Sequence, residues 1–336
     1  MEDHLGLCGL VNSGNSCYMN AVLQCLCSTI PLVDYCLQRH KHLSKFEGKV
    51  ARAFFGVVGM VWLRRQDSWT PSEMQAVVRS LHPQFNNHCQ QDSQELLLLL
   101  LSALHDDLKQ VFEGRALNVY SEQLEESQED LSSHGDSIIS HLFEGQLYYV
   151  MHCMKCNHQT HSQQVFTMLS LPIPNSDECS LQDCLRLFFK QSILTLDNCM
   201  LCPECGVKQE TAVLTSLTRP PEILVLHLKR FDCEGAKKKK LKTNVLFSLK
   251  NLDLNPFLSC PSAPYSRYSL YAVVNHTGDL DRGHYTACCY SPHVHSWHQF
   301  DDNVVNKIQD SMIQSPSAYI LFYSLQEFRC PDIPGM

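Results

Sequence analysis

Cys17 follows a run of glycine and asparagine residues and precedes a stretch of helical periodicity. Residues 9–16 read Gly-Leu-Val-Asn-Ser-Gly-Asn-Ser, and glycine and asparagine tolerate tight and left-handed backbone. The apolar pattern that comes next therefore predicts that Cys17 lies at or near a helix N-terminus. Unpaired N–H groups there favour a thiolate, which is the nucleophilic form of cysteine. These N–H groups and the side-chain amide of Asn12 could donate to a developing oxyanion.

A cysteine nucleophile needs an imidazole base, and the imidazole gains from an acceptor that fixes its tautomer. His284 stands at the entry of a β-rich run, and Asp301 and Asp302 follow a second such run. If the two runs pair as adjacent antiparallel strands, Asp301 comes within hydrogen-bond reach of the imidazole. Taken alone, Cys17 could equally be a small buried residue near a loop, and one of 17 histidines would more often be structural. The order Cys, His, Asp favours the catalytic interpretation.

Two C-x-x-C pairs stand in the middle of the chain: Cys153 with Cys156, and Cys202 with Cys205. Such a pair lets two thiolates from one tight turn reach one tetrahedral metal, with Zn–S near ~2.3 Å. The gap of 45 residues between the pairs predicts that each pair caps its own hairpin. Cys199 is an alternative ligand, but Pro203 and Gly206 suit a tight turn around the Cys202 pair. The other interpretation is four unligated thiols.

The elements that must position these residues are helices first and strands later. Apolar spacing predicts helices over residues 15–28, 71–81 and 91–108, the second with Thr70 as its N-cap. Short β-rich runs follow residue 140, at 145–151, 222–231, 268–275, 284–291 and 318–323. The order predicts a helical N-terminal lobe and a β-rich C-terminal lobe, hence an α+β chain. Residues 113–139, acidic and serine-rich at their centre, are interpreted as an exposed connection, with an acidic partner-binding segment as the alternative.

Composition limits the class of protein. The 336 residues are 44% hydrophobic and 18% charged, and the net charge is −8, so we expect a globular chain that does not bind nucleic acid. The longest apolar run is too short to span a bilayer, and the first residues lack a signal-peptide pattern. We therefore expect no membrane association and a reducing compartment in which most thiols are free or metal-bound.

Four segments, in order, resemble the motifs of the ubiquitin-specific proteases. Residues 9–20 resemble that family's cysteine box, residues 90–95 (Gln-Gln-Asp-Ser-Gln-Glu) a helix start, residues 224–231 the central strand, and residues 268–323 the histidine box. The similarity runs from about Leu7 to Leu325. It implies a papain-like α+β fold with a helical thumb, a β-rich palm and zinc-bearing β fingers.

The resemblance also implies roles for individual residues. Cys17 is the nucleophile, His284 the base, Asp301 its orienter and Asn12 an oxyanion donor. Asp302 assists or partly replaces Asp301, and the sequence does not separate the two. Asp92 is implied to line the channel for the ubiquitin tail, although a helix N-terminal charge explains it as well.

The same resemblance implies a domain plan, a cofactor and partners. Residues 1–112 form the thumb, 113–139 the connection, 140–225 mostly the fingers and 226–325 mostly the palm. One structural zinc ion is expected on the four paired cysteines. The expected substrate is ubiquitin or ubiquitinated protein, hydrolysed by a monomer in the cytoplasm, with the nucleus as the alternative. A silent ubiquitin binder and a protease for a ubiquitin-like modifier are the rival interpretations.

Overall fold

The computed structural model describes residues 5–40, 48–63, 67–86, 89–113, 136–232, 239–260, 267–279 and 282–331. The chain divides into two units. The first comprises Met1–Leu142, Ala272–Ile313 and Phe328–Met336, and the second Phe143–Tyr271 and Gln314–Glu327. Most of the predicted connection, residues 114–135, lies outside the described residues. The predicted division into thumb, fingers and palm stays a prediction.

The first unit begins with helices. They are α1 (Cys17–Cys27), α2 (Ile30–His40), α3 (Lys49–Leu63), α4 (Ser72–Leu81), α5 (Ser93–Glu113) and α6 (Ile138–Phe143). Every residue of α1 is buried, because α1 packs against α2, α3, α5 and strand β17. A helix surrounded in this way needs apolar residues on every side. The N-terminus of α1, where Cys17 lies, therefore belongs to a helix that is packed on all sides.

All three predicted helices start or end at residues other than the predicted ones, and α1 is shorter than predicted at both ends, Cys17–Cys27 against residues 15–28. α4 begins at Ser72, and the expectation of Thr70 as its N-cap is wrong: Pro71 takes the N-cap position with φ −80° and ψ 56°. The Ser72 N–H donates to the Thr70 carbonyl at 2.9 Å, so the chain turns tightly before the helix starts. α5 begins at Ser93 and runs to Glu113, beyond the predicted end.

Strands of the first unit form an antiparallel meander. It contains the second half of β16 (Arg267–Gly278), then β17 (Gly283–Ser291), β18 (Ser296–Asp301) and β19 (Val304–Ile308). A short parallel pair joins β1 (Gly9–Leu10), which precedes α1 in the chain, to β2 (Ser68–Trp69), which follows α3. β1 runs against the turn after β18: the Leu10 N–H donates to the Asp302 carbonyl at 2.9 Å, and a Cβ on Gly9 would collide with the Asn303 backbone.

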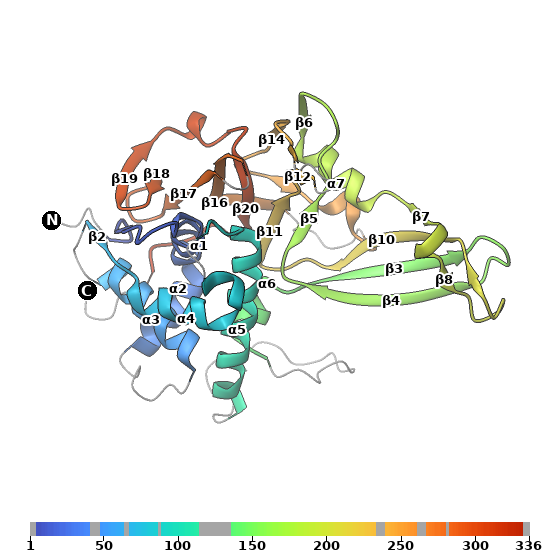
Figure 1. The fold of residues 1–336 in the computed structure, drawn as a ribbon, viewed down its shortest axis with the longest axis horizontal. Helices are drawn as coiled ribbons and strands as arrows, with labels where there is room; N and C mark the ends of the chain where they lie inside the picture. Colours follow the sequence, from blue (N-terminus) through green and yellow to red (C-terminus); the bar gives the residue numbers. More distant parts are fainter. Residues whose placement is uncertain are drawn as a thin grey trace. The chain divides into compact units, whose positions relative to one another are not determined.

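The second unit contains a long ribbon and a buried sheet. The ribbon is the four-stranded sheet of β4 (Gln159–Phe166), β3 (Gly145–Cys153), β10 (Thr211–Arg219) and β7 (Ser192–Leu194), with the small hairpin β8 (Met200–Leu201) and β9 (Lys208–Gln209) near its end (Figure 1). The buried sheet joins β5 (Leu169–Leu171), β11 (Ile223–Leu228), β20 (Ala318–Ser324) and the first half of β16, with β15 (Leu252–Asp253) pairing β16. β11 and β20 are buried along their whole length, as apolar runs covered on both faces should be.

Smaller elements complete the second unit. They are β6 (Glu178–Ser180) pairing β14 (Asn244–Leu246), β12 (Phe231–Asp232) pairing β13 (Lys239–Lys240), and helix α7 (Leu181–Phe189). Among the described residues, no single helix is long and apolar enough to cross a bilayer. One pair, α1 with α2, passes that test together, but it is bent by 86°. All residues of α1 are buried within the protein.

Candidate active site

Cys17 is the first residue of α1, so its predicted place at a helix N-terminus is confirmed. The loop before it turns through Gly14 (φ 99°) and Asn15 (φ 50°). The Asn12 side-chain oxygen closes this loop by accepting from the N–H groups of Gly14 at 3.0 Å and Ser16 at 3.1 Å. Asn12 therefore fixes the path of the chain that leads into the nucleophile.

The thiol of Cys17 is not activated by the helix terminus alone. Burial raises the pKa of Cys17 above its ordinary value, and the charge of Asp302 adds to this increase. Hydrogen bonding to the backbone at Tyr285, and more weakly at Tyr18 and Cys17 itself, lowers the pKa in opposition. The N–H groups of Tyr18 and Cys17 at the helix N-terminus thus favour the thiolate as expected, but burial outweighs them and the net pKa of Cys17 is raised. The thiol needs a base.

The base comes from the neighbouring strands. β17 and β18 are antiparallel, and they bring His284 Nε2 to 2.7 Å from Asp301 Oδ1. The predicted contact between imidazole and carboxylate is therefore confirmed. Both side chains keep about half of their surface exposed, 41% for His284 and 50% for Asp301. With Nε2 bound to the carboxylate, the lone pair of the neutral imidazole lies on Nδ1.

β17 also connects the base to the nucleophile. Its Tyr285, the residue after His284, is buried and forms the backbone hydrogen bond that lowers the pKa of Cys17. Since α1 packs directly against β17, the thiol and the imidazole belong to two elements in contact. The arrangement of a thiol, an imidazole and a carboxylate suits nucleophilic attack on a carbonyl carbon.

The two carboxylates that the sequence could not separate have different partners. Asp302 lies in the two-residue turn between β18 and β19, with φ 50°. Its Oδ2 accepts from Asn12 Nδ2 at 2.9 Å and its Oδ1 from Asn20 Nδ2 at 2.8 Å. Asp301 thus faces the base, whereas Asp302 is tied to the segment that carries the nucleophile.

Asn20 was not selected from the sequence. It lies three residues after Cys17, and its exposed fraction is 2%, so it is a buried amide in an apolar helix. Buried polar groups need partners, and Asn20 finds them in Asp302 and in the Leu10 carbonyl at 3.0 Å. A lone asparagine in an apolar helix beside a candidate nucleophile was the available signal.

Gln90 is a second residue whose contact the sequence did not predict. Its amide nitrogen donates to the Gly283 carbonyl at 2.5 Å, and its amide oxygen accepts from the Gly283 N–H at 2.6 Å. This pair of bonds anchors the residue immediately before His284. A Cβ on Gly283 would collide with the His276 ring, so the close approach requires glycine.

Asp92 precedes α5 and accepts from the Gln94 N–H at 2.8 Å. This is a helix-capping bond, which matches the structural alternative for this residue. Its charge also raises the pKa of Tyr285, so Asp92 lies near the strand that carries the base.

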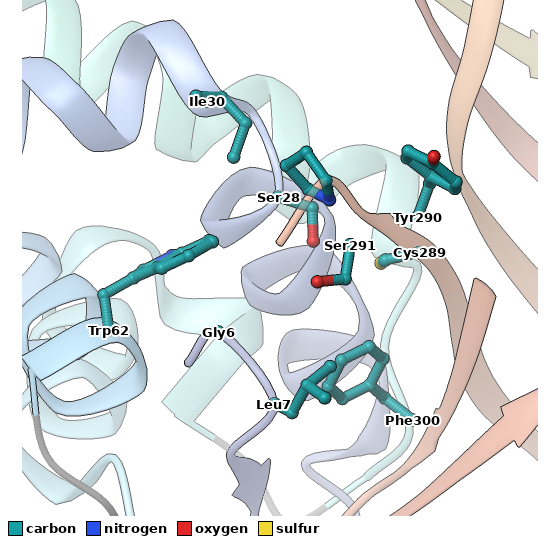
Figure 2. Close-up of a pocket in the computed structure, with 10 residues that line it drawn as sticks. Gly6, Leu7, Ser28, Ile30, Trp62, Cys289, Tyr290, Ser291 and Phe300 are labelled. Carbon is teal, nitrogen blue, oxygen red and sulfur yellow. The ribbon is translucent and has the colours of Figure 1, made fainter. Parts of the chain in front are cut away.

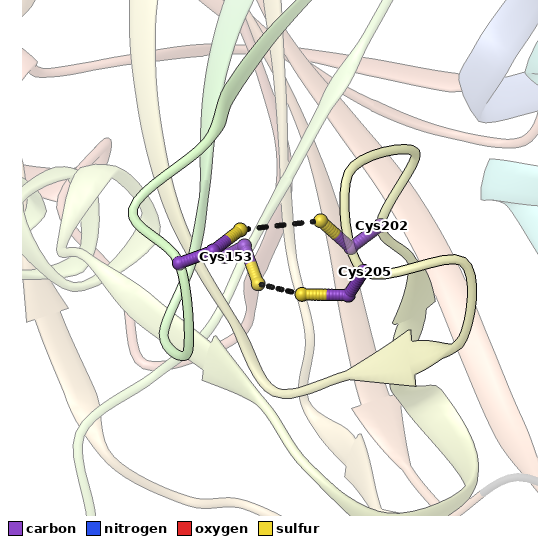
Figure 3. A group of neighbouring side chains, drawn as sticks. Cys153, Cys202 and Cys205 are labelled. Atoms are coloured by element: carbon purple, nitrogen blue, oxygen red, sulfur yellow. Dashed lines mark hydrogen bonds between the residues drawn. The ribbon is translucent and has the colours of Figure 1, made fainter.

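The four paired cysteines come together in the second unit. The Sγ atoms of all four lie within 4.8 Å of one another, with Cys153 to Cys205 at 3.9 Å and Cys156 to Cys202 at 3.6 Å (Figure 3). One pair lies at the turn from β3 to β4, the other at the turn from β8 to β9, so each caps its own hairpin as predicted. Cys199 is outside the group.

The electrostatics of this cluster favour a thiolate at Cys153, whereas the pKa of Cys156 is raised and hydrogen bonds with neighbouring thiols raise that of Cys205 to about 12. Backbone N–H groups of Cys156 and Lys155 lower the pKa of Cys153 to about 6. Four thiols at this separation suit one tetrahedral ion, because Zn–S bonds of ~2.3 Å place neighbouring sulfurs ~3.8 Å apart. The cysteine set therefore fits a metal ion with no open coordination position.

A small pocket lies elsewhere in the first unit. Figure 2 shows it between Trp62, Leu7 and Phe300, with Ser28 and Cys289 on its wall. The Trp62 indole N–H donates to the Cys27 carbonyl at 2.9 Å, which fixes this side of the pocket. None of the predicted catalytic residues lines it, so it is not the site of the proposed chemistry.

A thiol, an imidazole and a carboxylate are the side chains that cysteine peptidases combine. A family model, described as ubiquitin carboxyl-terminal hydrolase, matches residues 8–323. The chain belongs to the ubiquitin carboxyl-terminal hydrolase family.

Similar proteins include ubiquitin carboxyl-terminal hydrolase 2 of Bos taurus, 37% identical over 95% of this chain and 55% of the relative. Ubiquitin carboxyl-terminal hydrolase 21 of Homo sapiens is 34% identical over 96% of this chain and 62% of the relative. The chain thus spans little more than half the length of these curated relatives. The solved SAGA Ubp8/Sgf11/Sus1/Sgf73 DUB module bound to ubiquitin aldehyde contains a chain with a TM-score of 0.76 and 24% identity, covering 98% of this chain and 71% of that one. The predicted fold class is confirmed.

Proposed function

We propose that this chain is a deubiquitinating cysteine protease that hydrolyses the amide or isopeptide bond after the C-terminal glycine of ubiquitin. The observation that carries the proposal is the 2.7 Å bond between His284 and Asp301 on the strands that pack against the helix beginning at Cys17. Family membership and the names of the relatives support ubiquitin as the substrate.

The chemistry follows from the atoms that are free. Nδ1 of His284 takes the thiol proton. The positive charge of the imidazolium then offsets the cost that burial places on the Cys17 thiolate. The sulfur then attacks the carbonyl carbon, and the imidazolium returns the proton to the leaving amine. Water, deprotonated by His284, attacks the resulting thioester and releases the ubiquitin carboxylate and the thiol. Asp301 holds the imidazole orientation and stabilises its charged form.

Asn12 is proposed as a donor to the oxyanion. One hydrogen of its NH₂ group is directed to Asp302, and its oxygen is occupied by the loop N–H groups. An amide carries two N–H donors, so one remains for the substrate oxygen. In this scheme Asp302 is a positioning residue that orients Asn12, and Asp92 near β17 is proposed to meet basic side chains of the ubiquitin tail.

The metal of the four-cysteine cluster is proposed to be zinc. Four thiolates in tetrahedral geometry suit Zn²⁺ or iron, and the absence of an open position assigns a structural role. Bound zinc would hold the two hairpin tips together, and no chemical step passes through it. Metal analysis of the purified protein separates zinc from iron.

Two alternatives stand beside the active enzyme. The buried thiol with its raised pKa favours a silent ubiquitin binder if the imidazole does not engage it. A protease for a ubiquitin-like modifier is the second alternative, and it would use the same catalytic residues. We favour the active enzyme, because the predicted catalytic side chains are all present and the imidazole already holds its carboxylate.

The test is covalent labelling with ubiquitin that carries a thiol-reactive electrophile at its C-terminus. Wild type should form one adduct at Cys17, and Cys17→Ala should form none, while its folding is checked by circular dichroism. Labelling only by a probe built on a ubiquitin-like modifier would show that this modifier, and not ubiquitin, is the substrate. A folded, metal-loaded wild type that no probe labels would contradict the enzyme assignment.

Oligomeric state and location are also proposals. We propose a monomer in the cytoplasm, with the nucleus as the alternative; the location is proposed because the chain carries 18 cysteines, and reduced thiols persist in a reducing compartment. Light scattering on the purified chain tests the first point, and fractionation of cells tests the second.

A further inference from the structure

Two thiols and a buried guanidinium lie together in the second unit, outside the proposed metal site. Cys179 Sγ and Cys184 Sγ are 3.8 Å apart, and both cysteines are free. Cys179 is partly exposed, whereas Cys184 is fully buried. Cys179 is therefore the more accessible of the two cysteines.

The capping box of α7 brings the two thiols together. β6 runs directly into α7 (Figure 1), with Ser180 as the N-cap. The Ser180 hydroxyl accepts from the Asp183 N–H at 3.1 Å, and the Ser180 N–H donates to the Asp183 carboxylate at 3.0 Å. This box places the residue before the cap beside the fourth residue of the helix, where an apolar pair usually packs. Here both positions are cysteines.

Arg230 supplies an uncompensated charge next to this pair. Its side chain is fully buried. Nε donates to the Ala318 carbonyl at 2.6 Å and Nη1 to the Thr243 carbonyl at 2.8 Å. Nη2 has no acceptor, and within the described part of the chain no carboxylate forms an ion pair with it.

The charge of Arg230 acts on both sulfurs. It lowers the pKa of Cys179 and Cys184, although burial outweighs it and raises both, that of Cys184 to about 12. A cation at this place favours an anionic sulfur over a protonated one. It also disfavours a bound metal cation, so the pair is suited to sulfur redox chemistry and not to metal binding.

We propose that Cys179 and Cys184 form a reversible disulfide when the chain meets a peroxide. The Cys179 thiolate attacks one peroxide oxygen, the O–O bond breaks, and a sulfenic acid and water result. The Cys184 sulfur then attacks the Cys179 sulfur, forms the S–S bond and expels a second water. Hydrogen peroxide receives the two electrons. The sulfurs must approach from 3.8 Å to about 2.05 Å.

Peptide mapping tests this directly. Cleavage before Asp177, Asp183 and Asp197 yields the peptides 177–182 and 183–196, each with a single cysteine. The folded, metal-loaded wild-type chain is treated with hydrogen peroxide at mildly alkaline pH, alkylated and digested. The two peptides should appear as one disulfide-linked species and separate after dithiothreitol. Cys260→Ser, which removes an exposed thiol of the same unit, should give the same linked species.

Cys179→Ser should abolish the linked species and leave peptide 183–196 with an alkylated thiol. The proposal is overturned if wild-type peptides 177–182 and 183–196 remain alkylated while the exposed Cys260 and Cys330 are oxidised. It is equally overturned if Cys179 passes to sulfinic acid without a linked product. These readouts do not depend on ubiquitin hydrolysis, so the proposed function can fail without affecting them.

Discussion

At the scale of single residues, the site separates two adjacent carboxylates by giving each a different partner. Asp301 bonds the imidazole of His284, whereas Asp302 accepts from the amides of Asn12 and Asn20. The strand ends at Asp301 and the turn begins at Asp302, so the backbone change between the two sends their side chains to different groups. The two substitutions should therefore have different kinetic effects.

Asp301→Ala should lower kcat for a ubiquitin–amide reporter by on the order of 10²–10⁴-fold, because the imidazole loses the group that fixes its tautomer. Asp301→Asn serves as the matched variant, since it keeps the size and loses the charge. Steady-state kinetics with both variants give the result. A rate within twofold of wild type for Asp301→Ala would contradict its role as orienter.

Alkylation of Cys17 should report its raised pKa. In His284→Ala the thiol has lost its base, and burial keeps its pKa above the ordinary thiol value. The rate of iodoacetamide modification at Cys17 should therefore continue to rise at pH values where that of added N-acetylcysteine has already levelled off. Mass spectrometry of the Cys17 peptide and of the added thiol across a pH series provides the comparison. A Cys17 rate that levels off before that of N-acetylcysteine would refute a buried, protonated thiol.

At the scale of elements, two contacts hold the strand that carries the base. α1 packs on β17, and Gln90 pins Gly283 through two backbone bonds. Gln90 thus acts through the backbone of the neighbouring residue and is a positioning residue. Its substitution should alter the placement of His284 and leave the thiol itself intact.

Gln90→Ala should lower kcat by about tenfold with little change in KM, since each lost bond to the backbone contributes ~1 kcal/mol. Gln90→Glu, which can still accept from the Gly283 N–H, should recover part of the loss. The pH dependence of kcat should change in Gln90→Ala as the imidazole is released, a readout that general destabilisation does not affect. Unchanged kcat in a folded Gln90→Ala would show that the two hydrogen bonds between Gln90 and Gly283 are not needed for catalysis.

Zinc removal should act on the ribbon of the second unit. The four sulfurs hold the β3–β4 turn to the β8–β9 turn, so a chelator that removes the metal should release both turns. Hydrogen exchange should then increase around residues 153–158 and 200–209, with far smaller change in α1. Cys202→Ser, which removes one of the four metal ligands without any chelator, serves as the comparison. Protection that is the same with and without metal would contradict the structural role.

How much the sequence predicts differs between these elements. The helix at Cys17, the strands at His284 and before Asp301, and the two cysteine hairpins follow from periodicity, spacing and turn residues. The bracing by Gln90 and the contacts of Asn20 do not, because they join positions far apart in the chain that have no local pattern. The predicted start of α4 was wrong because Pro71 adopts a turn conformation, which a proline residue can adopt as well as a helical one.

At the scale of the whole molecule, an unusual number of thiols is kept protonated by burial. Burial raises the pKa of Cys8 to about 11 and of Cys288 to about 12, and it also raises those of Cys25, Cys27 and Cys36. The unfolded chain releases these protons near the ordinary thiol value of about 8.5. Above that value the folded state binds more protons than the unfolded state does.

Stability should therefore fall as the pH rises through 9, in the direction set by proton linkage. Each such thiol should contribute a loss of about 1.4 kcal/mol per pH unit between its unfolded and folded pKa. Urea unfolding between neutral and alkaline pH measures how the free energy of unfolding changes with pH. Cys36→Ala should reduce this slope by the contribution of one thiol. A flat profile would show that these thiols are not buried as described.

The central claim is that Cys17 forms a thioester with ubiquitin, and the most direct measurement is hydrolysis of a ubiquitin C-terminal amide reporter. Wild type should release the amine, and a rapid acid quench should trap a ubiquitin adduct on the peptide that contains Cys17. Cys17→Ala should do neither, while retaining ubiquitin binding. Turnover that persists in Cys17→Ala, or a folded and metal-loaded wild type without turnover, would contradict the account.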